Sequence, residues 1–292
     1  MSDVLCLGSC VLDLYAQDRK PTVGGDAANQ AILLTKLGLS AACCALLGQD
    51  EEADLIRSQL KAQGVDIRWL SQRPDQITTH SFIQLDENGE RQFTVTGEAH
   101  RHFTLADFPF RALPVFKILS LGSLFTLHEL ETSGLLSIFQ QAHAHGLTIY
   151  SDTTHDRHHK GLAGIAHLLP LIDVFMPSFE EIRTLCSRSQ PDEMAEELLR
   201  YGCPTVVLKM GAAGAAVYQE TQKWSCDGYP AKVIDATGAG DSFCAGFIAS
   251  RAAGLSFPQA LDNGCWCGAQ TVQWIGANTV PLNKSTLPWP LI

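Results

Sequence analysis

The sequence lacks the charge pattern of several common classes of protein. Its 292 residues carry 21 Lys and Arg against 31 Asp and Glu, so the formal net charge is −10. This balance disfavours a nucleic acid or an anionic membrane as a partner, because both need a basic surface. It leaves room for an anionic small molecule, which needs only a local positive pocket.

Signals for export, membrane insertion and disulfide formation are also missing. No apolar run approaches the roughly 18 residues of a membrane span, and the start, MSDVLCLGSC, lacks the basic stretch of a signal peptide. The ten cysteines form no CxxC pair and no zinc-ligand spacing. We interpret them as reduced core residues, since a free cysteine packs like a small hydrophobe, and we expect a cytoplasmic protein.

Two well-known phosphate-binding motifs are absent. The chain has no GxxxxGK[ST], so it is not a P-loop protein. The glycine turn at 238 reads GxGxxF, without the third glycine of a dinucleotide-binding helix, and it lies late in the chain. A nicotinamide-dependent enzyme is therefore not expected.

What the chain does have is a regular alternation of two kinds of segment. Short apolar runs such as 4–8 and 117–125 read as buried strands, and they alternate with segments of helical spacing such as 24–38. This alternation predicts a mostly parallel sheet with helices on both faces. Residues 79–97 break the pattern and predict a hairpin around an Asn88-Gly89 turn.

The segment 235–247, DATGAGDSFCAGF, places a carboxylate at the mouth of a glycine-rich turn that opens a helix. Such turns normally collect anions, which a carboxylate would repel. A kinase that phosphorylates a hydroxyl needs both features at one point, a base for the hydroxyl and backbone donors for the phosphoryl oxygens. The alternative is a capping Asp241 after a tight turn, and this segment alone does not decide between the two.

A second segment, GGDAANQA, begins at Gly24. Its two glycines let the backbone approach a ligand closely, and Asn29 follows where a helix begins, so its amide can hold a sugar hydroxyl. Taken alone, the pair Gly24-Gly25 is also explained as an ordinary turn.

Together the two segments resemble the paired motifs of the PfkB or ribokinase family of carbohydrate kinases. The matching positions are Gly24, Gly25, Ala27, Asn29, Ala31, Gly38 and Gly48, and then Asp235, Gly238, Ala239, Gly240, Asp241, Ala245 and Gly246. Ala236 departs from the family, which usually has Thr, Ser, Pro or Val there. The resemblance implies a ribokinase-like three-layer α/β/α sandwich over residues 1–292, with a small β lid built from about 13–24 and 79–98.

The resemblance also implies roles for single residues. Asp241 would be the base, Gly238, Ala239 and Gly240 the anion hole, and Mg²⁺ and ATP the cofactors. The substrate would be held by Asp13, Gly24, Gly25, Asn29 and Ser123. The nucleotide would lie against Ser178, Lys209, Gly211, Gly214, Gly240 and Cys265, the last standing where relatives often have Asn. Glu181 would position Mg²⁺ through water, and Asp235 and Thr237 would border a monovalent cation, with dependence on K⁺ left open by Ala236.

The substrate follows from departures within these motifs. Ribokinases often have Asn and Lys where this chain has Val11 and Asp26, so we expect a hexose or sugar acid rather than ribose. Arg91 or Arg157 would then pair with the carboxylate of a sugar acid. A nucleoside kinase and a catalytically silent sugar-binding regulator remain as alternatives. The hairpin is partly apolar on both faces, which predicts a homodimer through the lid.

The loop 151–161, SDTTHDRHHKG, allows two interpretations. Its histidines and aspartates could form a zinc site, but a polar loop at the end of a strand is the simpler explanation. The resemblance places Asp152 and Arg157 beside the cleft.

Overall fold

The structure is a computed structural model that describes residues 3–15, 20–85, 91–131, 133–157 and 159–291; side chains 83–93 lie outside the description. The chain folds around a nine-stranded sheet in the order β13-β12-β11-β10-β9-β8-β1-β4-β5. Neighbouring strands from β5 to β11 run parallel, whereas β12 and β13 form an antiparallel hairpin at one edge. The strands of this sheet are β1 (Val4–Leu7), β4 (Ala41–Gly48), β5 (Asp66–Arg73), β8 (Ile118–Leu124), β9 (Thr148–Thr153), β10 (Val174–Phe175), β11 (Val206–Lys209), β12 (Ala215–Gln219) and β13 (Gln222–Cys226).

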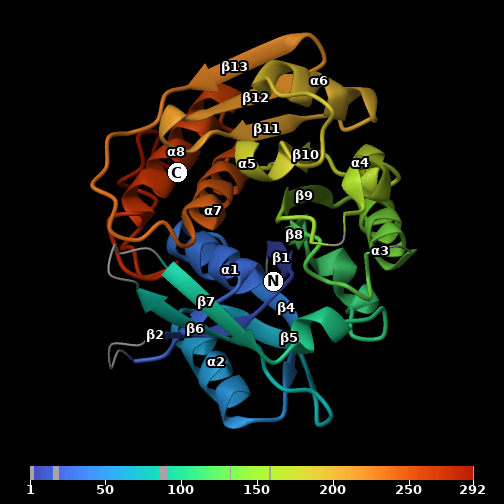
Figure 1. The fold of residues 1–292 in the computed structure, drawn as a ribbon, viewed down its shortest axis with the longest axis vertical. Helices are drawn as coiled ribbons and strands as arrows, with labels where there is room; N and C mark the ends of the chain where they lie inside the picture. Colours follow the sequence, from blue (N-terminus) through green and yellow to red (C-terminus); the bar gives the residue numbers. More distant parts are fainter. Residues whose placement is uncertain (1–2, 16–19, 86–90, 132, 158, 292) are drawn as a thin grey trace.

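Side chains of the central strands alternate between two separate cores. In β1, Val4 and Cys6 join one core, and Leu5 and Leu7 join the other. The first core is closed by α1 (Asp26–Lys36), α2 (Glu51–Ala62), α7 (Ala239–Ala252) and α8 (Phe257–Thr271). The second is closed by α3 (Ser133–Ala144), α4 (Gly161–Ile165), α5 (Phe179–Ile182) and α6 (Pro191–Arg200), with the 3-10 helices η2 (Phe110–Val115) and η3 (Leu169–Leu171). This is the three-layer α/β/α arrangement that the sequence predicts (Figure 1).

A second sheet of four strands has the order β3-β2-β6-β7. It consists of β2 (Val11–Tyr15), β3 (Thr22–Gly24), β6 (His80–Leu85) and β7 (Arg91–Thr96), and it lies below α7 and beside α1 in Figure 1. The parallel pairing of β2 with β6 joins segments far apart in the sequence, such as Leu12 and His80. The Asn88-Gly89 turn lies outside the described residues.

The structure also differs from the sequence interpretation. Strand β5 was not expected, because Asp66–Arg73 mixes charged and apolar residues and its side chains are mostly half-buried at the sheet edge.

All ten cysteines are free thiols, eight of them buried. None of the helices described is both long enough and apolar enough to cross a membrane.

Candidate active site

The glycine turn before α7 has a backbone that requires glycine. Gly238 is the N-cap of α7 with φ of 75°, and a Cβ there would lie 2.5 Å from the carbonyl oxygen of Ala277. Ala239 N–H donates to the carbonyl of Ala236 at 3.3 Å, so the turn closes on itself. The N–H groups of Gly240 and Asp241 follow in the first helical turn, where backbone donors have no intrahelical acceptor. The helix therefore presents donors at the same place as the Asp241 carboxylate.

Asp241 is held by the first motif of the chain. Asn29 Nδ2 donates to Asp241 Oδ2 at 2.8 Å, and Asn278 Nδ2 donates to Asn29 Oδ1 at 2.8 Å. Asn29 comes into place because Gly25, with φ of 91°, caps α1 where a Cβ would lie 2.6 Å from the Ser9 carbonyl oxygen. The amide expected to hold a sugar hydroxyl thus also orients the candidate base.

The charge state of Asp241 is set by burial and by other carboxylates. Burial, together with the negative charges of Asp26 and Asp152, raises the pKa of Asp241 to about 8, against the lowering effects of Asn29 and Lys209. The side chain remains half-buried rather than sealed. A carboxylate with a pKa near the working pH suits a general base, because it can take a proton from a hydroxyl and release it again.

Asp26 lies at the start of α1 and is braced by the strand ends around it. Its Oδ1 accepts from Ser9 N at 2.6 Å, from Ser9 Oγ at 2.8 Å and from Ala27 N at 2.7 Å. Ser123 also hydrogen-bonds Asp26, and burial raises the pKa of the Asp26 carboxyl against these contacts. Ser123, expected to contact the substrate, is therefore already engaged with Asp26.

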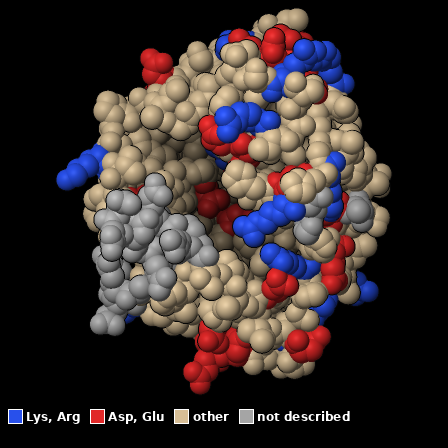
Figure 2. All heavy atoms as spheres, viewed as in Figure 1, with Lys and Arg blue, Asp and Glu red and all other residues tan. Residues whose placement is uncertain are grey.

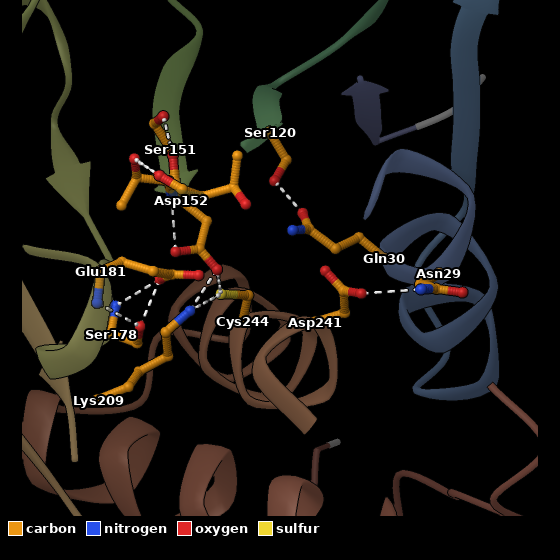
Figure 3. A network of polar contacts seen from close by, with 12 residues as sticks. Asn29, Gln30, Ser120, Ser151, Asp152, Ser178, Glu181, Lys209, Asp241 and Cys244 are labelled. Atoms are coloured by element: carbon orange, nitrogen blue, oxygen red, sulfur yellow. Dashed lines mark hydrogen bonds and ion pairs between the residues drawn. The ribbon is translucent and has the colours of Figure 1, made fainter. Parts of the chain in front are cut away.

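A buried ion pair lies on the other side of Asp241. Lys209 at the end of β11 pairs with Asp152 of β9, and both side chains are buried, at 9% and 7% exposure. Cys244, one turn after Asp241, lies 3.7 Å from Lys209 Nζ and 3.5 Å from Asp152 Oδ2. Figure 3 shows these side chains converging from two strands and α7. Lys209 Nζ would lie 3.4 Å from a Cβ on Gly240, so the ammonium is next to the glycine turn.

The two opposite charges of this pair keep each other ionised against the effect of burial. Burial raises the pKa of Asp152 to about 6 against the opposing charge of Lys209. Burial alone would lower the pKa of Lys209, but the Asp152 carboxylate outweighs it and raises that pKa. The pair is therefore ionised at neutral pH and keeps a cation beside Gly240.

Ser178 and Glu181 form a capping box at the start of α5. Ser178 N and Oγ donate to Glu181 Oε2 at 3.1 and 2.5 Å, and Glu181 N donates back to Ser178 Oγ at 3.3 Å. The negative charge of Glu181 acts on both Asp152 and Lys209. The sequence assigned these two residues to the nucleotide and Mg²⁺, and the structure brings them to the Lys209 side of Asp241 (Figure 3).

The remaining candidates lie around this centre with other contacts. Asp235 is buried, and its oxygens accept from Thr237 N at 2.7 Å and Gly276 N at 2.9 Å, which ties the expected cation loop to the segment after α8. Gly211 opens the 3-10 helix η4 (Gly211–Ala213), and Gly214 N donates to its carbonyl at 3.1 Å. Cys265 is buried on α8 and hydrogen-bonds Cys226.

The other candidate substrate residues are described only in part. Asp13 of β2 is buried, and its carboxylate lies against Gly24. Arg91 begins β7, but its side chain lies outside the description. Arg157 is exposed in the loop after β9. In the part of the chain that is described, His155 and His159 included, no three His, Cys, Asp or Glu residues are arranged to hold a metal ion.

The surface is hollowed above these groups. Figure 2 shows acidic atoms at the floor of a central hollow and basic atoms along one side of its rim. Sequence reasoning found Asp241, its glycine turn and Asn29 through their motifs. It did not predict the contacts of Asn278 and Cys244 or the pairing of Lys209 with Asp152, because no local motif marks those contacts.

The fold and this site define a class of phosphotransferase built on the ribokinase fold. A solved E. coli structure named as a ribokinase II, in complex with ATP and Mg²⁺, matches with a TM-score of 0.84 and 25% identity, covering 97% of this chain and 96% of that one. A fructokinase structure from Vibrio cholerae O395 matches with a TM-score of 0.84 at 24% identity and covers all of this chain and 99% of its own.

The pfkB family carbohydrate kinase model matches residues 1–284, and the chain belongs to that family. Fructoselysine 6-kinase of Escherichia coli K12 is 28% identical over 278 residues, 95% of this chain and all of that protein. A fructokinase of Escherichia coli is 29% identical over 294 residues, covering 94% of this chain and 95% of its own length. The expected family, fold class and activity are thereby confirmed: the protein is an ATP-dependent carbohydrate kinase.

Proposed function

We propose that Asp241 accepts the proton of a sugar hydroxyl, while the first turn of α7 and Lys209 stabilise the phosphoryl group as it passes from ATP to that hydroxyl and ADP leaves. The observation that carries this proposal is the position of one carboxylate. Asp241 stands in the first turn of a glycine-capped helix, is oriented by Asn29, and has a pKa of about 8. A base and preorganised donors at one point are what phosphoryl transfer to an alcohol needs.

The residues around Asp241 fit a nucleotide and its metal. Magnesium-bound ATP supplies the phosphoryl group. The N–H groups of Gly240 and Asp241 would donate to its oxygens, and Lys209, kept protonated by Asp152, would supply the nearby positive charge. Glu181 lies where its charge acts on Lys209, which suits the proposed contact with Mg²⁺ through water. Ser178, Gly211, Gly214 and Cys265 are kept as proposed nucleotide contacts, and Asp235 and Thr237 as a proposed monovalent cation site.

For the substrate we propose a hexose or a sugar acid rather than ribose. The relatives named as kinases of fructoselysine and fructose support a hexose-derived sugar. Asp13, Gly24, Gly25, Asn29 and Ser123 are the proposed substrate residues. If the sugar carries a carboxylate, the exposed Arg157 or Arg91 would pair with it.

One substrate screen tests this proposal. Phosphorylation rates with ATP should be measured on fructose, fructoselysine, ribose, aldonic acids, keto-deoxy acids and nucleosides. A sugar acid as best substrate predicts that Arg157→Ala or Arg91→Ala lowers kcat/KM about thirtyfold, the loss of a charge-assisted pair of about 2 kcal/mol. Ribose or a nucleoside leading the panel would refute the substrate proposal, and no turnover on any sugar would support a silent regulator instead.

The four-stranded sheet is the proposed lid and dimer surface. It carries Asp13 and leaves Phe82 and Val95 exposed at 38% and 49%, and a small sheet needs its apolar side chains covered to be stable. A second copy packing there would cover them. Sedimentation should then show a dimer at micromolar concentration, and a strict monomer would contradict the dimer. The free thiols fit a reducing compartment, so we keep the cytoplasm as the proposed location.

A further inference from the structure

The short 3-10 helix η1 (Ala99–His102) follows the last strand of the small sheet and lies over the large one. Ala99 N donates to the carbonyl of Ile77 at 3.3 Å, and η1 packs against β4. The carbonyl of Arg101 accepts from Glu129 N at 3.1 Å, in the segment that follows β8. These contacts place η1 at the carboxyl ends of β4 and β8, the same edge of the sheet at which Asp26 is braced.

His100 on this helix has one ring nitrogen in use. Its Nδ1 hydrogen-bonds the hydroxyl of Thr79 at 2.8 Å. Within the described part of the chain, no protein group hydrogen-bonds the other nitrogen, Nε2. The ring is half-buried, and Nε2 is not among the polar atoms sealed from solvent without a partner. The imidazole therefore presents one unused polar atom to open space.

The surroundings of His100 include both sides of the substrate cleft. Thr79 belongs to the substrate side, because its carbonyl accepts from Leu12 N at 3.0 Å, next to Asp13. Arg157, in the loop after β9, lies close enough for its charge to act on the same ring. Burial, and then the positive charges of Arg101, His102 and Arg157, lowers the pKa of His100 to about 4. The ring is thus neutral at any pH at which the enzyme would be assayed.

We propose that His100 Nε2 hydrogen-bonds one hydroxyl of the sugar and helps to select the substrate. This inference rests on the proposed function, because it assumes a sugar between the small sheet and Asp241. The tautomer decides only the direction of the bond. If the Thr79 hydroxyl donates to Nδ1, then Nε2–H donates to the sugar; if Nδ1–H donates to Thr79, then Nε2 accepts from it.

Other roles for His100 fit the structure less well. With a pKa of about 4, its nitrogen is a poor proton acceptor compared with Asp241, which already occupies the position of the base. A neutral ring also cannot pair with a carboxylate as a cation. A neutral ring with one unused nitrogen can still form a hydrogen bond to a hydroxyl, and this is the role that we assign to it.

Two substitutions separate this role from a structural one. In His100→Asn the amide stands near the place of Nδ1, so the bond to Thr79 can persist while the group at Nε2 is lost. In His100→Gln the amide reaches the place of Nε2. We expect His100→Asn to lower kcat/KM on the best sugar of the panel on the order of tenfold, mainly through KM, and His100→Gln to recover most of the loss.

His102→Asn is the matched control. His102 lies on the same helix, is exposed, and bonds Glu129 Oε1 through Nδ1 at 2.7 Å, so its substitution should leave kcat/KM unchanged. A merely structural role for His100 predicts the reverse order, with His100→Asn mild and His100→Gln harmful.

A series of deoxy sugars completes the test. The wild type should lose kcat/KM when the contacted hydroxyl is removed, and His100→Asn should lose nothing further on that one analogue. A His100→Asn enzyme with wild-type KM, or one that discriminates against every deoxy analogue as the wild type does, overturns this inference and leaves the proposed function standing. A wild type that phosphorylates none of the sugars overturns the proposed function and this inference together.

Discussion

The two sheets of this protein are built differently. Every residue of β4 in the large sheet is buried, because helices cover both faces. The small sheet exposes Phe82 and Val95 and consists of strands of three to six residues. The large sheet and its helices hold the proposed base, Lys209 and Asp152, whereas the small sheet contributes Asp13 and leads into His100. The proposed reaction chemistry thus lies in the more buried part of the molecule, and the proposed sugar contacts lie in the more exposed part.

The largest expected effect is on the rigid side of this comparison. Asp241→Asn keeps the shape of the side chain and the contact with Asn29 but removes the proton acceptor. Turnover should fall about 100- to 10,000-fold, the contribution of a positioned base. ATP affinity, measured by calorimetry, should be largely kept, because no proposed nucleotide contact is removed. An Asp241→Asn enzyme with more than about a tenth of wild-type turnover would refute the assignment.

Breaking the buried ion pair should affect folding as well as catalysis. Lys209→Met leaves the Asp152 carboxylate buried without its cation, which typically costs about 3–5 kcal/mol of unfolding free energy. The double variant Lys209→Met with Asp152→Leu should regain much of that stability but not the activity. Denaturant unfolding and turnover of the wild type and the two variants check this, and equal stability of Lys209→Met and wild type would contradict it.

A change in pH should reveal the neighbours of Asp241. Its ionised form is the base, and its pKa is raised to about 8, so kcat/KM should rise with pH and level off above that value. Asp26→Asn removes a negative neighbour while its oxygen can still accept from Ser9 and Ala27. The rising limb should therefore move to lower pH in this variant. If kcat/KM of this variant rises at the same pH as that of the wild type, Asp26 does not raise the pKa of Asp241.

The smallest expected effect is on the small sheet. Phe82 is exposed, so Phe82→Ser should change the unfolding free energy by less than about 0.5 kcal/mol. Phe247→Ala in the first core, where the ring is fully buried, should cost about 3–5 kcal/mol. Sedimentation of Phe82→Ser should show a weaker dimer if the small sheet is the interface. Similar losses of unfolding free energy in Phe82→Ser and Phe247→Ala would contradict the difference in burial between the two sheets.

The order of strands and helices could be predicted from the sequence because most elements have a clear period or a capping residue. The edge strand β5 could not, since its half-buried side chains follow no period. The glycine turn before α7 was found because its residues are contiguous. The Lys209–Asp152 pair and the Asn278–Asn29 bond join residues 57 and 249 positions apart, and only the tertiary fold brings them together. The proposed role of His100 could not be predicted from the sequence for another reason. It depends on which of the two ring nitrogens has no hydrogen-bond partner in the fold.

The hydrogen bond from Asn278 fixes the orientation of the Asn29 amide beside the proposed base. Asn278 also donates to the carbonyl of Val23 at 2.8 Å, and Lys36 Nζ donates to the carbonyls of Asn278 and Val280 at 2.5 and 2.9 Å. Because Asn278 donates to Asn29 Oδ1, the Asn29 amide is oriented with its nitrogen toward Asp241. An irregular segment after the last helix therefore determines which way the Asn29 amide faces. An ionised aspartate at position 278 can only accept hydrogen bonds. Asn278→Asp would therefore favour the flipped Asn29 amide, with its oxygen toward Asp241.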